Sequence, residues 1–118
     1  MKKRVPKIGV LILILAVEVV SASLIQLKKK CEEGDGKSCT EMGKILSEKE
    51  GKEMNFSKVI YFFKRGCNLG DAEGCYNTAL MYGKGKEAIN HYPQIFFYLK
   101  RGCKLGDKRS CFLYRNLQ

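Results

Sequence analysis

The six cysteines are the residues of this sequence with the most obvious chemistry. They form three pairs whose partners are eight positions apart, and the pairs recur at 36-residue intervals, from 31 to 67 and from 67 to 103. Cysteines can bind a metal ion, act as nucleophiles or form disulfides. A fixed period of this length is typical of a repeat protein. The pairs are Cys31 and Cys39, Cys67 and Cys75, and Cys103 and Cys111.

The N-terminal residues predict the localisation of the chain. A basic start is followed by the apolar run 8–17 and by small residues that end at Ala22, the pattern of a secretory signal peptide. We therefore expect a leader over residues 1–22 and a mature domain over residues 23–118, secreted or periplasmic in a bacterium. The alternative is an uncleaved inner-membrane anchor over residues 8–25, which would place Glu18 near mid-bilayer at a cost of about 2.5–3.5 kcal/mol.

Export favours disulfides over the other two kinds of cysteine chemistry. An even number of cysteines in a short exported chain is typical of a disulfide framework. A structural zinc ion needs four ligands, and the single histidine, His91, lies in another part of the repeat. Six cysteines allow 15 pairings, but the local repetition favours pairing within each copy. We expect no metal and no cofactor.

The residues around each cysteine pair predict two helices joined by a tight turn. A hydrophobic segment closes on basic residues before the first cysteine of each copy, as in residues 60–66, and lysine and arginine suit a helix C-terminus. A glycine able to take the left-handed conformation follows the first cysteine, and an aspartate able to cap the next helix follows the glycine. These residues are Gly34, Gly70 and Gly106, with Asp35, Asp71 and Asp107. The turn would bring the two cysteines of a copy within disulfide distance.

Copies of such a helix pair predict an all-α fold, an α/α solenoid of about two and a half repeats. Removing residues 1–22 takes four basic and one acidic side chain from the 22 and 12 of the whole chain, which leaves a net charge of +7. That charge favours anionic partners, while nucleic acid is a poor candidate for an exported chain without a nucleic-acid-binding motif. Incomplete repeats at both ends would leave faces that self-association or a partner could cover.

Basic residues at one repeat position predict a ridge along the stack. The ridge would join residues 28–30 with Lys64, Arg65, Lys100 and Arg101, as an anion site or simply as helix-end charges in water. Tyr76 and Asn77 are candidates for a groove face, and ordinary packing is their alternative. The aromatic runs 61–63 and 96–98 are expected to lie in the core.

The second copy resembles a known repeat. Residues 71–82, with Gly85, are similar to the Sel-1-like repeat, an α/α unit related to the tetratricopeptide repeat. The cysteine pair with its Leu-Gly-Asp turn resembles the cysteine-rich Sel-1-like proteins of the Helicobacter cysteine-rich family, over residues 24–118. The sequence departs from the repeat pattern at Thr78, Val59 and Ile95. The resemblance implies a binding scaffold with a concave groove for a peptide, a protein or a cell-wall fragment, and members of the family are also described as slow β-lactamases that bind penicillins.

The residues themselves give little support to the hydrolase alternative. A serine β-lactamase uses Ser-x-x-Lys, Ser-Asp-Asn and Lys-Thr-Gly motifs, none of which occurs in the sequence. A Tyr-x-Asn match at residues 114–116 is too short to carry weight, and we name no catalytic residue. The sequence therefore predicts a binding scaffold, with a weak β-lactamase as the alternative. A degenerate paralogue without activity of its own is the third reading.

Overall fold

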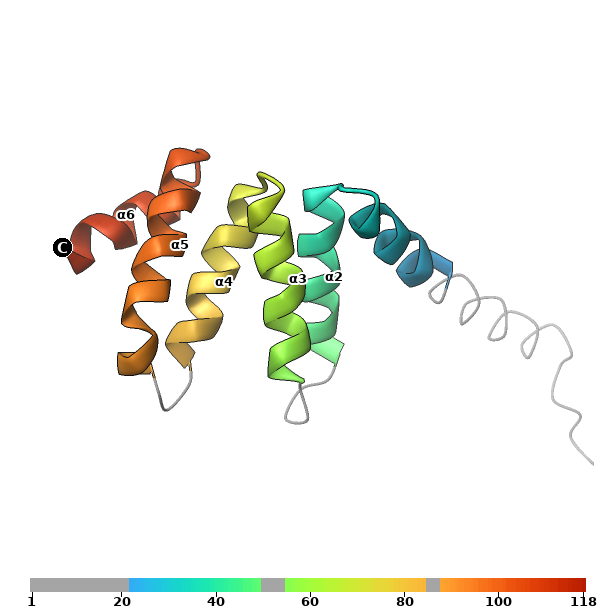
Figure 1. Cartoon of the computed structure of the whole chain (residues 1–118), viewed down its shortest axis with the longest axis horizontal. Helices are drawn as coiled ribbons and strands as arrows, with labels where there is room; N and C mark the ends of the chain where they lie inside the picture. The colour runs from blue at the N-terminus through green and yellow to red at the C-terminus, as the bar shows by residue number, and fades with distance from the viewer. Residues whose placement is uncertain (1–21, 50–54, 85–87) are drawn as a thin grey trace, which may run out of the picture.

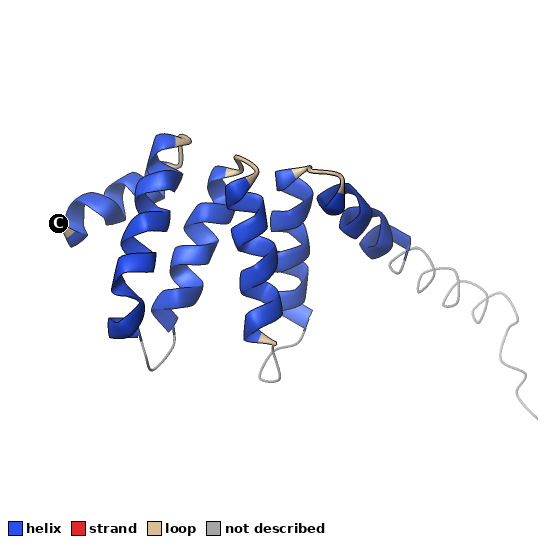
Figure 2. Cartoon of the chain, in the orientation of Figure 1, coloured by secondary structure: helices blue, strands red, loops and turns tan. Residues whose placement is uncertain are grey.

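The computed structural model describes residues 22–49, 55–84 and 88–118, and it shows only helices and turns in these residues (Figure 2). The predicted leader and the alternative anchor fall almost entirely outside these ranges. Within them, none of the helices combines the length and apolar character needed to cross a bilayer. The helices are the segment 22–32, α2 (Gly36–Lys49), α3 (Phe56–Asn68), α4 (Ala72–Lys84), the short 3-10 helix η2 (Ala88–His91), α5 (Tyr92–Lys104) and α6 (Lys108–Leu117).

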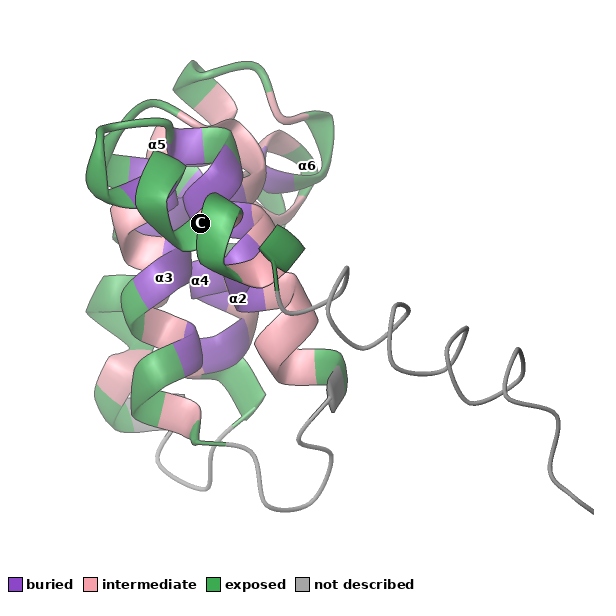
Figure 3. Cartoon of the chain, turned by 90° about the vertical axis from the view of Figure 1, so that its right-hand side faces the viewer, coloured by how far each residue is buried: buried purple, intermediate pink, exposed green. Residues whose placement is uncertain are grey.

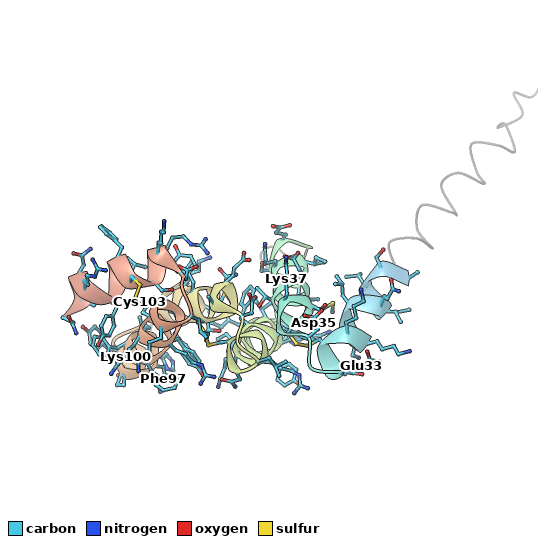
Figure 4. The ribbon with its side chains drawn as sticks, turned by 90° about the horizontal axis from the view of Figure 1, so that it is seen from above. Glu33, Asp35, Lys37, Phe97, Lys100 and Cys103 are labelled. Atoms are coloured by element: carbon cyan, nitrogen blue, oxygen red, sulfur yellow. A yellow bond between two sulfur atoms is a disulfide. The ribbon has the colours of Figure 1, made fainter. Side chains whose placement is uncertain are left out.

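The helices stack in chain order, with each packed against the next (Figure 1). Helix α4 also contacts both α2 and α6. Seen from above, α3 and α5 lie on one side of the stack, whereas α2 and α6 lie on the other (Figure 4). The packing is therefore repeat-like, with α3 and α5 as one layer and α2, α4 and α6 as the second.

Three turns of the same geometry join the helices at the cysteine pairs. In the second copy, the N–H of Gly70 donates to the carbonyl of Cys67, and the N–H of Asp71 donates to the carbonyl of Gly66, both at 2.9 Å. Gly70 has a φ of 96°, so a residue with a side chain would be strained there. This arrangement is the Schellman motif that commonly ends helices. The first and third copies repeat it at Gly34 and Gly106.

A disulfide closes each turn, and the structure confirms local pairing within each copy. The Cα atoms are 4.6 Å apart in the first pair and 4.5 Å apart in the second and third. Such short distances need helices that nearly touch, and small residues before the cysteines allow this approach. In the second copy, a Cβ on Gly74 would lie 2.7 Å from the backbone nitrogen of Cys67. The pairs are Cys31–Cys39, Cys67–Cys75 and Cys103–Cys111.

Gly66 shows how closely successive copies pack. A Cβ there would collide with the hydroxyl of Thr40 on α2 and would lie 3.0 Å from the carbonyl oxygen of Gly36. We expect Gly66→Ala to lower the free energy of unfolding by about 1–3 kcal/mol, because overpacking outweighs the gain in helix propensity. Gly83→Ala is the matched control, since among the described residues the atom near its Cβ is the Cδ1 of Ile95 at 3.9 Å, an ordinary contact distance. Urea unfolding that shows equal effects for the two variants would contradict this packing.

The turn aspartate acts as an N-cap where the third copy begins its second helix. An oxygen of Asp107 accepts a hydrogen bond from the N–H of Ser110 at 2.8 Å, and the other pairs with Arg109 at 2.8 Å. Burial raises the pKa of Asp107, but the hydrogen bonds and charge of Arg109 and Ser110 outweigh burial, so the pKa is lowered overall. The pKa of Asp35 is also lowered, chiefly by the hydroxyl of Ser38. The carboxylates of Asp35 and Asp107 therefore stabilise the folded chain when they are ionised.

The lowered pKa of Asp107 predicts a pH dependence of stability. A carboxylate with a lower pKa in the folded chain contributes stability above its unfolded pKa of about 4 and loses it as the pH falls through the folded value. We expect Asp107→Asn, which keeps a cap acceptor, to cost roughly 0.5–1 kcal/mol at pH 7 and much less at pH 3. Urea unfolding at both pH values measures the difference. A cost that is equal at pH 7 and pH 3 would show that ionisation of Asp107 is not responsible.

The core lies between the layers and corrects part of the sequence analysis (Figure 3). Phe62, Phe63 and Tyr98 are buried as expected, but Tyr61 is 57% exposed and Phe97 is 53% exposed. A helix turns by about 100° per residue, so three consecutive aromatic side chains cannot all face one core. The prediction that both aromatic runs lie wholly in the core was therefore wrong.

Residues at which the sequence departs from the repeat pattern fit the packing. Thr78 is fully buried, and its hydroxyl donates to the carbonyl of Gly74 at 2.7 Å. Val59 is also fully buried, whereas Ile95 is half-buried beside the core. A buried hydroxyl that has a hydrogen-bond acceptor costs little, so the threonine is accommodated.

Candidate binding surfaces

The predicted basic ridge lies on the layer of α3 and α5 and contains apolar residues as well as cations. At one repeat position stand three exposed apolar side chains, followed three and four residues later by basic ones. Figure 4 shows Phe97 and Lys100 together on α5, on the side away from α6. We call this set the apolar–basic ladder. Its members are Ile25, Lys28 and Lys29 on the segment 22–32, Tyr61, Lys64 and Arg65 on α3, and Phe97, Lys100 and Arg101 on α5.

The two arginines of the ladder hold neighbouring copies together. The Nε of Arg65 donates to the carbonyl of Cys31 at 3.4 Å, and its Nη2 donates to the carbonyl of Glu32 at 3.4 Å. Arg101 donates in the same way to the carbonyl of Asn68 at 3.4 Å. Each guanidinium thus satisfies carbonyls at the C-terminal end of the equivalent helix one copy earlier, which is the negative end of its dipole. The sequence predicted an anion site or simple helix-end charges for these arginines, and the structure adds contacts between copies.

Lys64 lies at the edge of the same layer, against a group of aromatic rings. Burial lowers its pKa, but hydrogen bonding and charge interactions with Tyr82 and Tyr98 raise the pKa by more, so the ammonium stays charged. Tyr82 stacks on Tyr98 with ring centroids 6.1 Å apart and lies 5.1 Å from the ring of His91. His91 is half-buried at the end of η2 and makes no side-chain cap to α5. Lys64 is half-buried whereas Lys100 is exposed, so Lys100 is the more accessible of these two lysines of the ladder.

The structure separates the two predicted groove residues, Tyr76 and Asn77. Tyr76 is half-buried, and the guanidinium of Arg109 lies over its ring at 4.1 Å from the centroid. This cation–π contact ties α4 to α6 and uses the face of the ring. Asn77 lines an open groove instead. Only Asn77 therefore lies where a ligand could reach it directly.

That groove lies between α2 and α4, on the layer opposite the ladder. Its volume is about 270 Å³. Leu80 supplies accessible apolar surface, while Lys44 and Glu73 supply charge and form an ion pair at 2.9 Å. Phe63 and Met81 also line the groove but are almost fully buried. Hydrogen bonds to Glu73 and Glu41 raise the pKa of Lys44. The remaining lining residues are Ser47, Glu48, Asn77 and Lys84.

A second groove of about 260 Å³ adjoins the first, because Leu80 and Lys84 line both. It lies among α4, α5 and α6 and is almost entirely apolar, with Ile95, Leu113 and Leu117 among its lining residues. The two grooves lie on either side of Leu80 and Lys84 of α4, the first facing α2 and the second facing α5 and α6. We call the two grooves together the α4 groove.

Most residues of the α4 groove were not found from the sequence. Lys44 and Glu73 belong to different copies, and neither is marked by a motif. The aligned period offers one signal, because Leu80 stands 36 residues after Lys44, at the equivalent repeat position. Side chains at that position on successive copies face the same layer, so aligning the copies could have indicated a shared surface.

Neither a metal site nor a known relative adds to this description. In residues 22–49, 55–84 and 88–118, no three His, Cys, Asp or Glu side chains gather closely enough to hold a metal ion. No family model, curated protein or solved structure matches the chain. The likeness to Sel-1-like repeats therefore stays a prediction from the residues.

Proposed function

We propose that this protein is an exported binding scaffold, an α/α solenoid of about two and a half Sel-1-like repeats that takes a peptide or a segment of a protein in the α4 groove. The oxidised cysteine pairs support export, because such disulfides persist in oxidising compartments. The repeat-like packing and the three equivalent turns support the solenoid.

The α4 groove is the observation that carries the binding function. It offers apolar surface at Leu80 beside the polar groups of Lys44, Glu73 and Asn77. Binding sites for peptides and small molecules combine a largely apolar lining with a few polar groups that fix orientation. The ion pair of Lys44 and Glu73 presents both signs of charge, which suits the amide dipoles and mixed side chains of a peptide better than a uniformly charged polymer.

The length of the groove also favours a peptide over a smaller ligand. The two parts of the groove flank α4, and helices that pack directly have axes about 8–10 Å apart. Because α2, α4 and α6 are alternate helices, a ligand that contacts all three must span at least about 16–20 Å, which needs an extended peptide of five or more residues at about 3.3 Å per residue. We therefore expect a segment of that length, with apolar side chains at the end that meets α6.

Selection from a random displayed peptide library, on the oxidised protein, tests the proposal. We expect Leu80→Lys to weaken binding of the selected peptides at least tenfold, because Leu80 lines both halves of the groove. Leu105→Lys is the matched control, because it makes the same change at an exposed leucine at the end of α5. It should alter the affinity for the selected peptides less than twofold. Thermal melts confirm that both variants fold. Peptides whose affinity falls equally in the two variants, or a library that yields no binder, would contradict the proposal.

No observation on the described residues favours the hydrolase alternative, so we propose binding alone. The purified oxidised protein can be assayed with a chromogenic β-lactam. Turnover that scales with protein concentration and survives repurification would show that binding is an incomplete account.

A further inference from the structure

We propose that the apolar–basic ladder docks this protein on an anionic lipid surface, with the α4 groove on the opposite layer left free for its ligand. The ladder is distinct from the α4 groove, and none of its nine residues lines that groove. The inference goes beyond the proposed function, and either one can fail without the other.

The apolar positions of the ladder are exposed in all three copies. Ile25 is 69% exposed, and its equivalents Tyr61 and Phe97 are more than half exposed. Leu69 and Leu105 stand eight residues after the two aromatic residues and are also exposed. The layer of α3 and α5 thus exposes an apolar side chain about every two turns of each helix. Aromatic side chains in such places partition into the interface of a bilayer.

The charge of the ladder complements an anionic surface. Helices α3 and α5 contain no Asp or Glu at any position. Their basic residues beyond the ladder are Lys58 and Lys104, both exposed. Glu32 and Glu33, at the end of the segment 22–32, are the acidic groups closest in sequence to the ladder. Each basic residue near an anionic membrane adds its own contribution to the attraction between protein and membrane. Arg65 and Arg101 therefore contribute their charge even though they donate hydrogen bonds to backbone carbonyls.

The shape of the ladder favours a lipid surface over an acidic protein. The depressions on α3 and α5 are each lined by residues of one helix and its following turn, such as Phe97, Lys100, Arg101, Lys104 and Leu105. Neither is a cleft between helices that could enclose a partner's side chain. Protein hot spots usually fill enclosed, desolvated pockets, whereas a lipid interface needs only exposed apolar groups and nearby cations.

A single tryptophan gives a local probe, because the chain contains none. Phe97→Trp places the probe in the ladder, and Phe112→Trp places it on α6, where Phe112 is 66% exposed. The oxidised full chain is titrated with vesicles of phosphatidylglycerol and phosphatidylcholine, and with vesicles of phosphatidylcholine alone. We expect the emission of the ladder tryptophan to shift to shorter wavelength with the anionic vesicles only, and that of the α6 tryptophan to stay unchanged.

Charge variants in the Phe97→Trp background test the electrostatic part. Lys100→Gln with Lys104→Gln should raise the lipid concentration for the half-maximal shift roughly tenfold or more. Lys37→Gln with Lys108→Gln is the matched control, because it removes the same charge from exposed positions on α2 and α6. This pair should raise the lipid concentration for the half-maximal shift less than threefold. The proposal is overturned by equal effects of the two pairs, by equal shifts of the two tryptophans, or by equal response to both vesicles. It is also overturned if poly-glutamate shifts the ladder tryptophan and vesicles do not, which would assign the ladder to an acidic protein.

Discussion

Reducing all three disulfides is expected to unfold the protein at room temperature. Closing a loop as short as each of these contributes about 2.5 kcal/mol by chain entropy, so three disulfides together contribute roughly 7.5 kcal/mol. A small domain has a total stability near the lower end of 5–15 kcal/mol. The stability lost on reduction is therefore about equal to the total stability expected of the domain. Far-ultraviolet circular dichroism, with and without a phosphine reductant, measures the result, and a helical signal unchanged by complete reduction would contradict it.

The three disulfides should be reduced in a definite order. Cys31, Cys39, Cys67 and Cys75 are at most 1% exposed, whereas Cys103 and Cys111 are half-buried. Since reduction requires access to a sulfur atom, Cys103–Cys111 should open first, and α6 should lose its attachment to α5 before the rest unfolds. Timed alkylation followed by mass spectrometry reads the order. A Cys103→Ser, Cys111→Ser variant serves as the control and should retain the two buried disulfides.

Replacing Phe63 by alanine is expected to lower the free energy of unfolding by about 3–5 kcal/mol, the usual cost of removing a buried aromatic ring. Phe63 is 4% exposed. Its ring would touch a Cβ on Gly43 of α2, and it belongs to the same core cluster as Val59 and Met81. One side chain therefore joins α2, α3 and α4.

Tyr61→Ala is the matched control for Phe63→Ala, since it removes an aromatic ring two residues earlier on the same helix. Because Tyr61 is exposed, we expect it to change stability by less than about 1 kcal/mol. Phe63→Ala should lower the melting temperature by at least about 12 °C. Similar melting temperatures for the two variants would show that Phe63 is not the link between these helices.

The parts of the fold that depend on local sequence were predictable. The turn at Gly70 follows from a glycine placed between a helix end and an aspartate just before the next helix, all within a few residues. The cysteine pairing follows from the same turn, because it brings Cys67 and Cys75 together without help from any distant residue.

The candidate binding surfaces depend on contacts between copies, so the sequence predicted them only in part. Whether Tyr61 or Phe63 is buried depends on which face of α3 meets α2 and α4, and the spacing of an unbroken aromatic run does not decide this. Arg65 was expected to be a free cation, but its hydrogen bonds reach residues more than 30 positions earlier. Tyr76 was a candidate for the groove, yet Arg109 of the next copy covers its ring.

The central claim is an exported helical scaffold in which each copy is closed by its own disulfide. Intact-mass measurement and non-reducing peptide mapping of the protein recovered from the periplasm or the medium test it most directly. We predict a mass that reflects six oxidised cysteines, an N-terminus at residue 23, and cross-linked peptides joining Cys31 to Cys39, Cys67 to Cys75 and Cys103 to Cys111. Free thiols, or peptides linked between different copies, would contradict the account.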